Sequence, residues 1–307
     1  MAKLRTNHSK GESGGSGNIV KVGIFSAVIG GLFLLFNQFT GGGSDTPVDD
    51  NSNNTNQQTE REYTPSESYL PTSTTNDVIH HKYYSISYSE QDEQAEWVAY
   101  TLTKENLNKP WVKRKDTFLP DSKVKSKSST PNDYRGSGYD RGHLVPAADM
   151  AFSEEAMRET FFMSNISPQS HNFNGGIWRE LEELTRNWAK RMDKLYVVTG
   201  PVLTYEPKGY IGDNEVAIPA AFFKVLLDLS APGSKGIGFV IPNEVSFDPL
   251  YKFAVSIDRV EEISGLDFFP DLLEKEEEEQ LEGDFNIDIW PFSKQKFEER
   301  IEKWNKQ

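Results

Sequence analysis

The sequence predicts an α+β domain with a central antiparallel sheet, preceded by one N-terminal transmembrane helix and a disordered linker. Three observations support this prediction. One apolar run lies near the N-terminus, and a polar segment follows it. The rest of the chain contains several apolar runs of strand length and a few helical stretches, which occupy different parts of the sequence. We therefore divide the chain into a short cytoplasmic tail (1–18), a transmembrane signal anchor (19–39), a disordered linker (40–76) and one globular domain (77–307).

The apolar run extends from Val22 to Phe36 and is interrupted only by Ser26. With Ile19 and Val20 included, its length meets the lower limit of about 18 residues for a membrane span. Basic residues precede the run and acidic residues follow it, which predicts an N-terminus inside and a domain outside the cytoplasm. The alternative is a cleaved signal peptide, which would leave the domain secreted, although no small-residue cleavage site follows cleanly.

The polar segment at 40–76 consists mainly of Gly, Ser, Thr, Asn, Asp, Gln and Pro. Such a composition buries too little apolar surface to offset the entropy of ordering, so we expect a flexible tether. The formal net charge of −14 argues against a protein that coats nucleic acid by bulk electrostatics, but it leaves room for a local basic cleft. The absence of cysteine excludes thiolate nucleophiles, cysteine-based zinc sites and disulfides.

Apolar alternation and buried runs predict the strands of the domain. They lie at Tyr84–Tyr88, Trp97–Leu102, Leu195–Pro201, Phe222–Leu229 and Gly236–Pro242. Helical signals are confined to Glu154–Glu159, Ile177–Lys190 and Lys294–Trp304. The acidic run Glu274–Glu279 is predicted to be a solvated helix face or loop, with an acidic partner site as the alternative.

Imidazole chemistry can come from few positions, because the chain has 5 His. Three of them lie in the tail or beside the linker: His8, His80 and His81. This leaves His143 and His171, and we expect His171 to be structural or solvent-facing. His143 stands in a segment rich in Arg, Asp and Gly, where glycine permits close backbone approach and arginine binds phosphate in a bidentate manner. The alternative is a glycine-rich turn in which Asp140 pairs with an arginine.

A second polar segment begins about twenty residues later, at Asn165, and continues into a helix whose apolar residues recur at helical spacing. Asn174 is expected at or just before the start of this helix. It could serve as the N-cap or as an oxygen ligand for Mg²⁺. Glu182 and Arg186 are four residues apart, so an ordinary salt bridge along the helix would also explain them.

Together the two segments resemble the DNA/RNA non-specific endonuclease family of the ββα-metal superfamily, which includes endonuclease G and the Serratia-type nuclease. The family's Asp-Arg-Gly-His signature matches residues 140–143. Its second signature matches Asn165, Pro168, Gln169, Asn174, Trp178, Leu181 and Glu182. The resemblance extends over roughly residues 80–272 and implies the ββα-metal nuclease fold.

The resemblance implies a role for each matched polar residue. His143 would be the general base that activates water. Asn174 would bind a largely hydrated Mg²⁺, or alternatively Mn²⁺, and Glu182 would hold that metal through water. The catalytic and phosphate-binding arginines would be Arg114, Arg141 and Arg186, and Asn165 would orient the site and contribute to substrate binding. Asp140 and Gly142 would hold the turn.

The implied function is metal-dependent hydrolysis of phosphodiester bonds in DNA and RNA, without base recognition. Two alternatives remain open: a membrane-tethered nucleic-acid-binding module without catalysis, and a related phosphodiesterase. The binding module explains poorly why the base, metal and glutamate positions are all filled. A basic rim for nucleic acid is expected around Arg114, at Lys113, Lys115, Lys123, Lys125 and Lys127.

Overall fold

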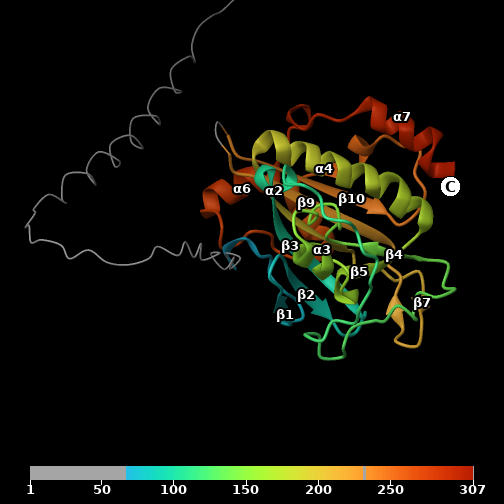
Figure 1. The fold of residues 1–307 in the computed structure, drawn as a ribbon. Helices are drawn as coiled ribbons and strands as arrows, with labels where there is room; N and C mark the ends of the chain where they lie inside the picture. Colours follow the sequence, from blue (N-terminus) through green and yellow to red (C-terminus); the bar gives the residue numbers. More distant parts are fainter. Residues whose placement is uncertain (1–66, 231–232, 307) are drawn as a thin grey trace, which may run out of the picture. The chain divides into compact units, whose positions relative to one another are not determined.

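The computed structural model describes residues 67–230 and 233–306, and its centre is one seven-stranded sheet (Figure 1). The strand order is β1-β2-β3-β6-β9-β10-β11, and every pair is antiparallel. The strands are β1 (Val78–His80), β2 (Ser85–Ser89), β3 (Gln94–Thr103), β6 (Lys194–Pro201), β9 (Ala221–Asp228), β10 (Lys235–Pro242) and β11 (Ala254–Val255). The predicted mixed fold with a central antiparallel sheet is therefore confirmed.

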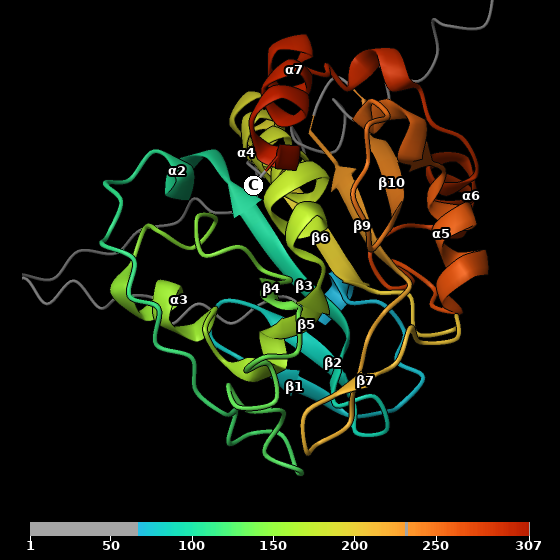
Figure 2. The same cartoon turned by 90° about the vertical axis from the view of Figure 1, so that its right-hand side faces the viewer.

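Both faces of the sheet are covered, because side chains alternate along its strands. On β3, Val98 and Tyr100 join the core on one face, and Trp97 and Ala99 join the core on the other. The first face packs against α4 (Arg179–Met192). The second packs against α5 (Ile257–Ser264) and α6 (Lys275–Gly283), as Figure 2 shows. The result is a sheet between two layers of helices.

The α4 side of the sheet carries most of the remaining elements. A hairpin is formed by β4 (Asp140–His143) and β5 (Ile166–Gln169), and a π-helical turn, η4 (Phe173–Trp178), leads into α4. The C-terminal helix α7 (Lys294–Glu302) packs against α4. The short remaining elements are η2 (Glu67–Tyr69), α2 (Lys104–Leu107), α3 (Glu154–Glu159), η3 (Met163–Asn165), β7 (Tyr210–Ile211), β8 (Val216–Ala217), η5 (Leu250–Phe253), η6 (Ile287–Ile289) and η7 (Trp304–Lys306).

The N-terminal predictions fall mostly outside the described residues. This holds for the tail (1–18), the anchor (19–39) and the linker as far as residue 66. Within residues 67–230 and 233–306, no helix combines the length and apolar character that a membrane crossing requires.

The last part of the predicted linker, residues 67–76, differs from expectation because it packs on the domain. The Tyr69 side chain is 1% exposed, and the backbone N–H of Thr72 donates to the carbonyl oxygen of Asp267 at 2.9 Å. The buried Tyr69 ring and the hydrogen bonds of Thr72 with Asp267 and Trp97 hold this stretch to the domain, and composition alone does not reveal these contacts.

Candidate active site

The β4–β5 hairpin presents Arg141 and His143 on one face, because they are two residues apart on the same strand. Their backbone partners on β5 are Pro168 and Ile166. Gly142 lies between them, and a Cβ atom added there would lie 2.1 Å from the side chain of Gln169. Close packing across the hairpin therefore leaves no room for a side chain at Gly142, the residue expected to hold the turn.

Two phenylalanine rings bring His143 together with two arginines. The imidazole ring lies 4.9 Å from the Phe161 ring and 5.7 Å from the Phe118 ring, measured between centroids. The guanidinium carbon of Arg114 lies 5.3 Å from the centroid of Phe161, and that of Arg141 lies 4.3 Å from the centroid of Phe118. Cation–π contacts of this kind orient a guanidinium without neutralising it. Arg114 also pairs through its Nε with Oδ1 of Asp116 at 2.6 Å, so it is the two terminal nitrogens of its guanidinium that remain for an anion.

The environment of His143 keeps its imidazole neutral. Burial, together with the positive charges of Arg114 and Arg141, lowers its pKa to about 3. Its Nε2 is buried and has no hydrogen-bond partner within the part of the chain that the structure describes. A neutral imidazole with an unpartnered nitrogen, flanked by two cations, can accept a proton once an anionic substrate lies beside it.

The pKa of His143 gives a prediction for stability. The folded pKa lies below the value of about 6.5 for an unperturbed histidine, so the unfolded chain binds the proton first as the pH falls. This contribution to stability is complete above about pH 6.5 and is lost toward pH 3. We therefore expect His143→Ala to become progressively more stable relative to wild type as the pH falls through this window. Urea unfolding measured from pH 7.5 to 4.5 checks it, and parallel stability curves for the two proteins would contradict it.

Asn174 lies within the π-helical turn and connects it to β4. Its amide nitrogen Nδ2 donates to Oδ2 of Asp140 at 2.9 Å, and His171 Nδ1 lies 3.0 Å from the same carboxylate oxygen. The N-cap alternative for Asn174 is wrong, because the N-cap position of the turn is Asn172. Asp140 therefore joins the hairpin to the helix. His171 has an exposed side chain, as expected, although it also pairs with Asp140.

Glu182 and Arg186 belong to a buried charged cluster beneath α4. Arg186 Nη1 donates to Oδ1 of Asp149 at 2.7 Å. The ion pair of Arg186 is therefore with Asp149, and not with Glu182 as the four-residue spacing suggests. Burial raises the pKa of Glu182 to about 7, against the opposing charges of Arg186 and Lys224. Burial also lowers the pKa of Lys224 to about 8, against the charge of Glu182. Each of the two groups thus favours the charged form of the other.

Asn165 is fully buried, so the substrate contact predicted for it is not available in this structure. Its Oδ1 accepts from the backbone N–H of Val145 at 2.9 Å, and its Nδ2 donates to the carbonyl oxygens of Val145 and Thr160. The amide satisfies two backbone groups of Val145, just after His143, and one of Thr160, which fixes the path of the chain after His143.

Sequence reasoning missed Asp149 and Lys224. Asp149 is 2% exposed and also accepts from the Tyr100 hydroxyl at 2.7 Å. Lys224 is fully buried on β9, and its Nζ lies 4.9 Å from the centroid of Trp178. One signal could have found Lys224, because a lysine inside an otherwise apolar strand is rarely buried without a charged neighbour.

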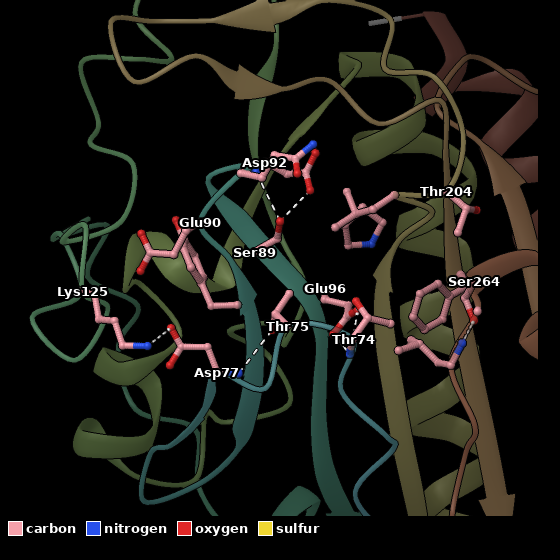
Figure 3. A pocket seen from close by; sticks show the side chains of 17 residues that line it. Thr74, Thr75, Asp77, Ser89, Glu90, Asp92, Glu96, Lys125, Thr204 and Ser264 are labelled. Carbon is pink, nitrogen blue, oxygen red and sulfur yellow. Dashed lines mark hydrogen bonds and ion pairs between the residues drawn. The ribbon is translucent and has the colours of Figure 1, made fainter.

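The predicted basic rim separates into two parts. Lys113 and Lys115 line a cavity beside the loop of Arg114. Lys125 instead forms an ion pair with Asp77 at 3.0 Å, at the edge of another cavity of about 610 Å³ (Figure 3). That cavity contains none of the predicted site residues. Its acidic lining residues are Asp77, Glu90, Asp92 and Glu96, which makes it unsuitable for phosphate.

The described contacts thus form a group of Arg114, Arg141 and His143, and a separate cluster that contains Glu182 and Arg186. Asn174 is joined to the strand of His143 through Asp140. A neutral histidine between two arginines, on a mixed fold with an antiparallel sheet, defines an enzyme with a site suited to a phosphate-containing substrate.

The profile of the DNA/RNA non-specific endonuclease family matches residues 66–275 of the chain. The chain belongs to this family, and it is a nuclease. Human endonuclease G, a mitochondrial protein, is 36% identical over 203 residues, which cover 62% of this chain and 68% of the human protein. Nuclease C1 of Cunninghamella echinulata var. echinulata is 37% identical over 215 residues, which cover 65% of this chain and 85% of that protein.

The mitochondrial nuclease EXOG of Xenopus laevis is 37% identical over 208 residues, or 62% of this chain, and the match spans only 57% of the frog protein. This chain also aligns with the crystal structure of the EndoG/EndoGI complex, with a TM-score of 0.60 and 34% sequence identity. The alignment covers 65% of this chain and 88% of that chain. The helix α7 lies beyond the segment that the family profile matches.

Proposed function

We propose that this protein is a Mg²⁺-dependent, sugar-non-specific endonuclease that hydrolyses phosphodiester bonds of DNA and RNA with His143 as general base. The neutral imidazole of His143 between the guanidinium groups of Arg114 and Arg141 is the observation that carries the proposal. The proposal also includes Glu182 and Arg186 as catalytic residues and Asn174 as the direct metal ligand.

In this proposal Arg114 and Arg141 bind the scissile phosphate and offset the charge that develops on its oxygens. The bound anion adds negative charge beside His143, which raises the pKa of its imidazole from the low value of the empty site. His143 thus becomes a stronger base when substrate is present. Its imidazole then takes the proton from the attacking water. Contacts with the phosphate backbone alone are consistent with acceptance of both DNA and RNA.

The side chains of Asn174 and Glu182 fit the requirements of Mg²⁺ or Mn²⁺, because both metals favour oxygen ligands. The Asn174 amide uses its nitrogen to donate to Asp140, which leaves its oxygen as the group for a cation. Arg186 and Lys224 favour the charged form of the Glu182 carboxylate, against the burial that raises its pKa to about 7, and a bound cation would favour that form further. When bound, the metal would stabilise negative charge on the leaving oxygen.

The proposal is tested by incubating the purified full chain with plasmid DNA and with RNA, in Mg²⁺, in Mn²⁺ and in chelator. We expect both substrates to be degraded with either metal and to remain intact with chelator. Intact nucleic acids under all conditions, with binding retained, would instead indicate the non-catalytic module. A small phosphodiester is assayed in parallel, and its hydrolysis while DNA and RNA stay intact would indicate a related phosphodiesterase.

Lys113 and Lys115 should contribute more to nucleic-acid binding than Lys123 and Lys125. The first two line a cavity beside Arg114, where Lys115 Nζ lies 3.5 Å from the exposed carboxylate of Glu154. Lys125 instead pairs with Asp77 at 3.0 Å, and Lys123 donates to the carbonyl oxygen of His80. Replacing the first pair by glutamine is expected to weaken DNA binding and to reduce the salt slope of log K by about 2. Binding titrations at several salt concentrations measure this, with the second pair as the control. A larger loss in the control would contradict the assignment.

We further propose that residues 19–39 anchor the protein in a membrane, with the nuclease domain outside the cytoplasm. The apolar run and the charges that flank it support this orientation. The expected result is recovery of the full-length chain in the membrane fraction, with its domain digested by protease added to intact cells. Recovery of a shortened chain in the medium would favour cleavage and secretion.

A further inference from the structure

The face of the sheet opposite α4 carries a carboxylate cluster that the proposed reaction does not use. Asp258 and Glu261 lie three residues apart on α5 and therefore share one side of that helix. Glu282 lies near the end of α6, which packs against α5 (Figure 2). One carboxylate oxygen from each of the three residues lies within 4.8 Å of the others.

Glu282 is the residue that makes this cluster more than an acidic surface. Its side chain is 3% exposed, and its Oε1 is buried with no hydrogen-bond partner in the described part of the chain. An unpaired buried carboxylate is costly, so a group of this kind requires a proton or a cation.

The charges that act most strongly on Glu282 are of one sign. They come from Glu261, Glu278, Asp258 and Asp267. Burial first, and then these carboxylates, raise the pKa of Glu282 to about 9. The cluster therefore differs from the buried carboxylates beneath α4, where Arg186 and Lys224 balance the charge.

We propose that Asp258, Glu261 and Glu282 form a Ca²⁺ site that joins α6 to α5. Ca²⁺ takes six to eight oxygen ligands at about 2.3–2.6 Å, so oxygens on opposite sides of one ion lie about 4.8 Å apart. The three carboxylate oxygens all lie within that distance of one another, so a single ion can contact all of them. Asp258 is exposed and leaves a route for the ion and its waters, and one oxygen of Glu261 is held by the backbone N–H of Phe268 at 2.8 Å.

Bound Ca²⁺ would stabilise the fold and would not take part in the hydrolysis. The ion replaces mutual repulsion of the carboxylates by attraction to a common centre, and it binds the folded chain better than the unfolded one. Because α6 packs on β10 as well as on α5, the stabilisation extends to β10, the strand next to the edge strand β11.

The test is the thermal unfolding of the full chain, with Ca²⁺ added as the chloride to chelator-treated protein, together with calorimetric titration of Ca²⁺. At a concentration of about 100 times the dissociation constant, we expect the unfolding midpoint to rise by about 5–11 °C. Glu282→Gln is expected to abolish this rise. Glu279→Gln, an exposed change on the same helix, should retain it.

Two further variants keep the test decisive. Asp258→Asn changes only the exposed end of the site and should also lose the rise, which covers the case that Glu282→Gln does not fold. Asn174→Ala removes the proposed active-site ligand and should keep the rise, which separates this site from that one. The absence of a rise in wild type would overturn the proposal. An undiminished rise in both Glu282→Gln and Asp258→Asn would also overturn it. So would loss of the rise in Asn174→Ala alone.

Discussion

Replacing His143 with alanine is expected to reduce hydrolysis of both DNA and RNA by about 10²–10⁴-fold, the range that a positioned general base contributes. The imidazole is neutral and lies beside Arg114 and Arg141, which we propose bind the phosphate. Its Nε2 makes no hydrogen bond within the described residues and is therefore free to accept a proton. Binding of nucleic acid should persist, because Arg114 and Arg141 are packed on Phe161 and Phe118 and remain in place.

The measurement is the initial rate of plasmid and RNA cleavage at saturating Mg²⁺, with the binding affinity of each variant determined separately. His80→Ala serves as the control, since His80 lies on the edge strand β1 and bonds to Ser85. The control should retain wild-type rates. A His143→Ala variant with the wild-type rate would remove His143 from the mechanism, whereas loss of rate and binding together would assign it a binding role.

The sequence could predict Arg141 and His143 because their signal is local, whereas Arg114 was expected only from the family resemblance. Arg141 and His143 are two residues apart in a short motif, and no other region contains that motif. The main strands were also predictable, since their apolar runs are long enough to show a period. The predicted strand at Leu195–Pro201, for example, is observed at Lys194–Pro201.

What could not be predicted depends on pairs of residues that are distant in the sequence. Asp149 binds Arg186 across 37 positions, and nothing near either residue indicates the other. The edge strand β11 contains only two residues, Ala254 and Val255, which is too short for an alternating pattern. Asn174 was placed at a helix N-terminus because its sequence precedes an apolar periodic stretch, but the chain forms a π-helical turn with a kink at Gly176.

The contacts between α7 and α4 also join residues that are distant in the sequence. Arg300 is fully buried, and its Nε donates to Oε2 of Glu180 at 2.6 Å. Its two remaining nitrogens donate to the carbonyl oxygens of Ser246 and Asp248. On the same pair of helices, Lys296 pairs with Glu183. Because α4 also carries Glu182 and Arg186, the C-terminal helix supports the helix on which the proposed site depends.

Arg300→Met is therefore expected to lower the free energy of unfolding by about 3–5 kcal/mol, because it leaves the Glu180 carboxylate buried without its partner. The double variant Glu180→Met/Arg300→Met should recover part of that loss, since no isolated charge remains. Urea unfolding of each variant gives these values. Arg259→Met, which removes an exposed pair with Glu262, is the control and should change stability by less than about 1 kcal/mol. If Arg300→Met lowers the free energy of unfolding no more than Arg259→Met does, the contact of α7 with α4 does not stabilise α4. The buried pair would then be dispensable for the site.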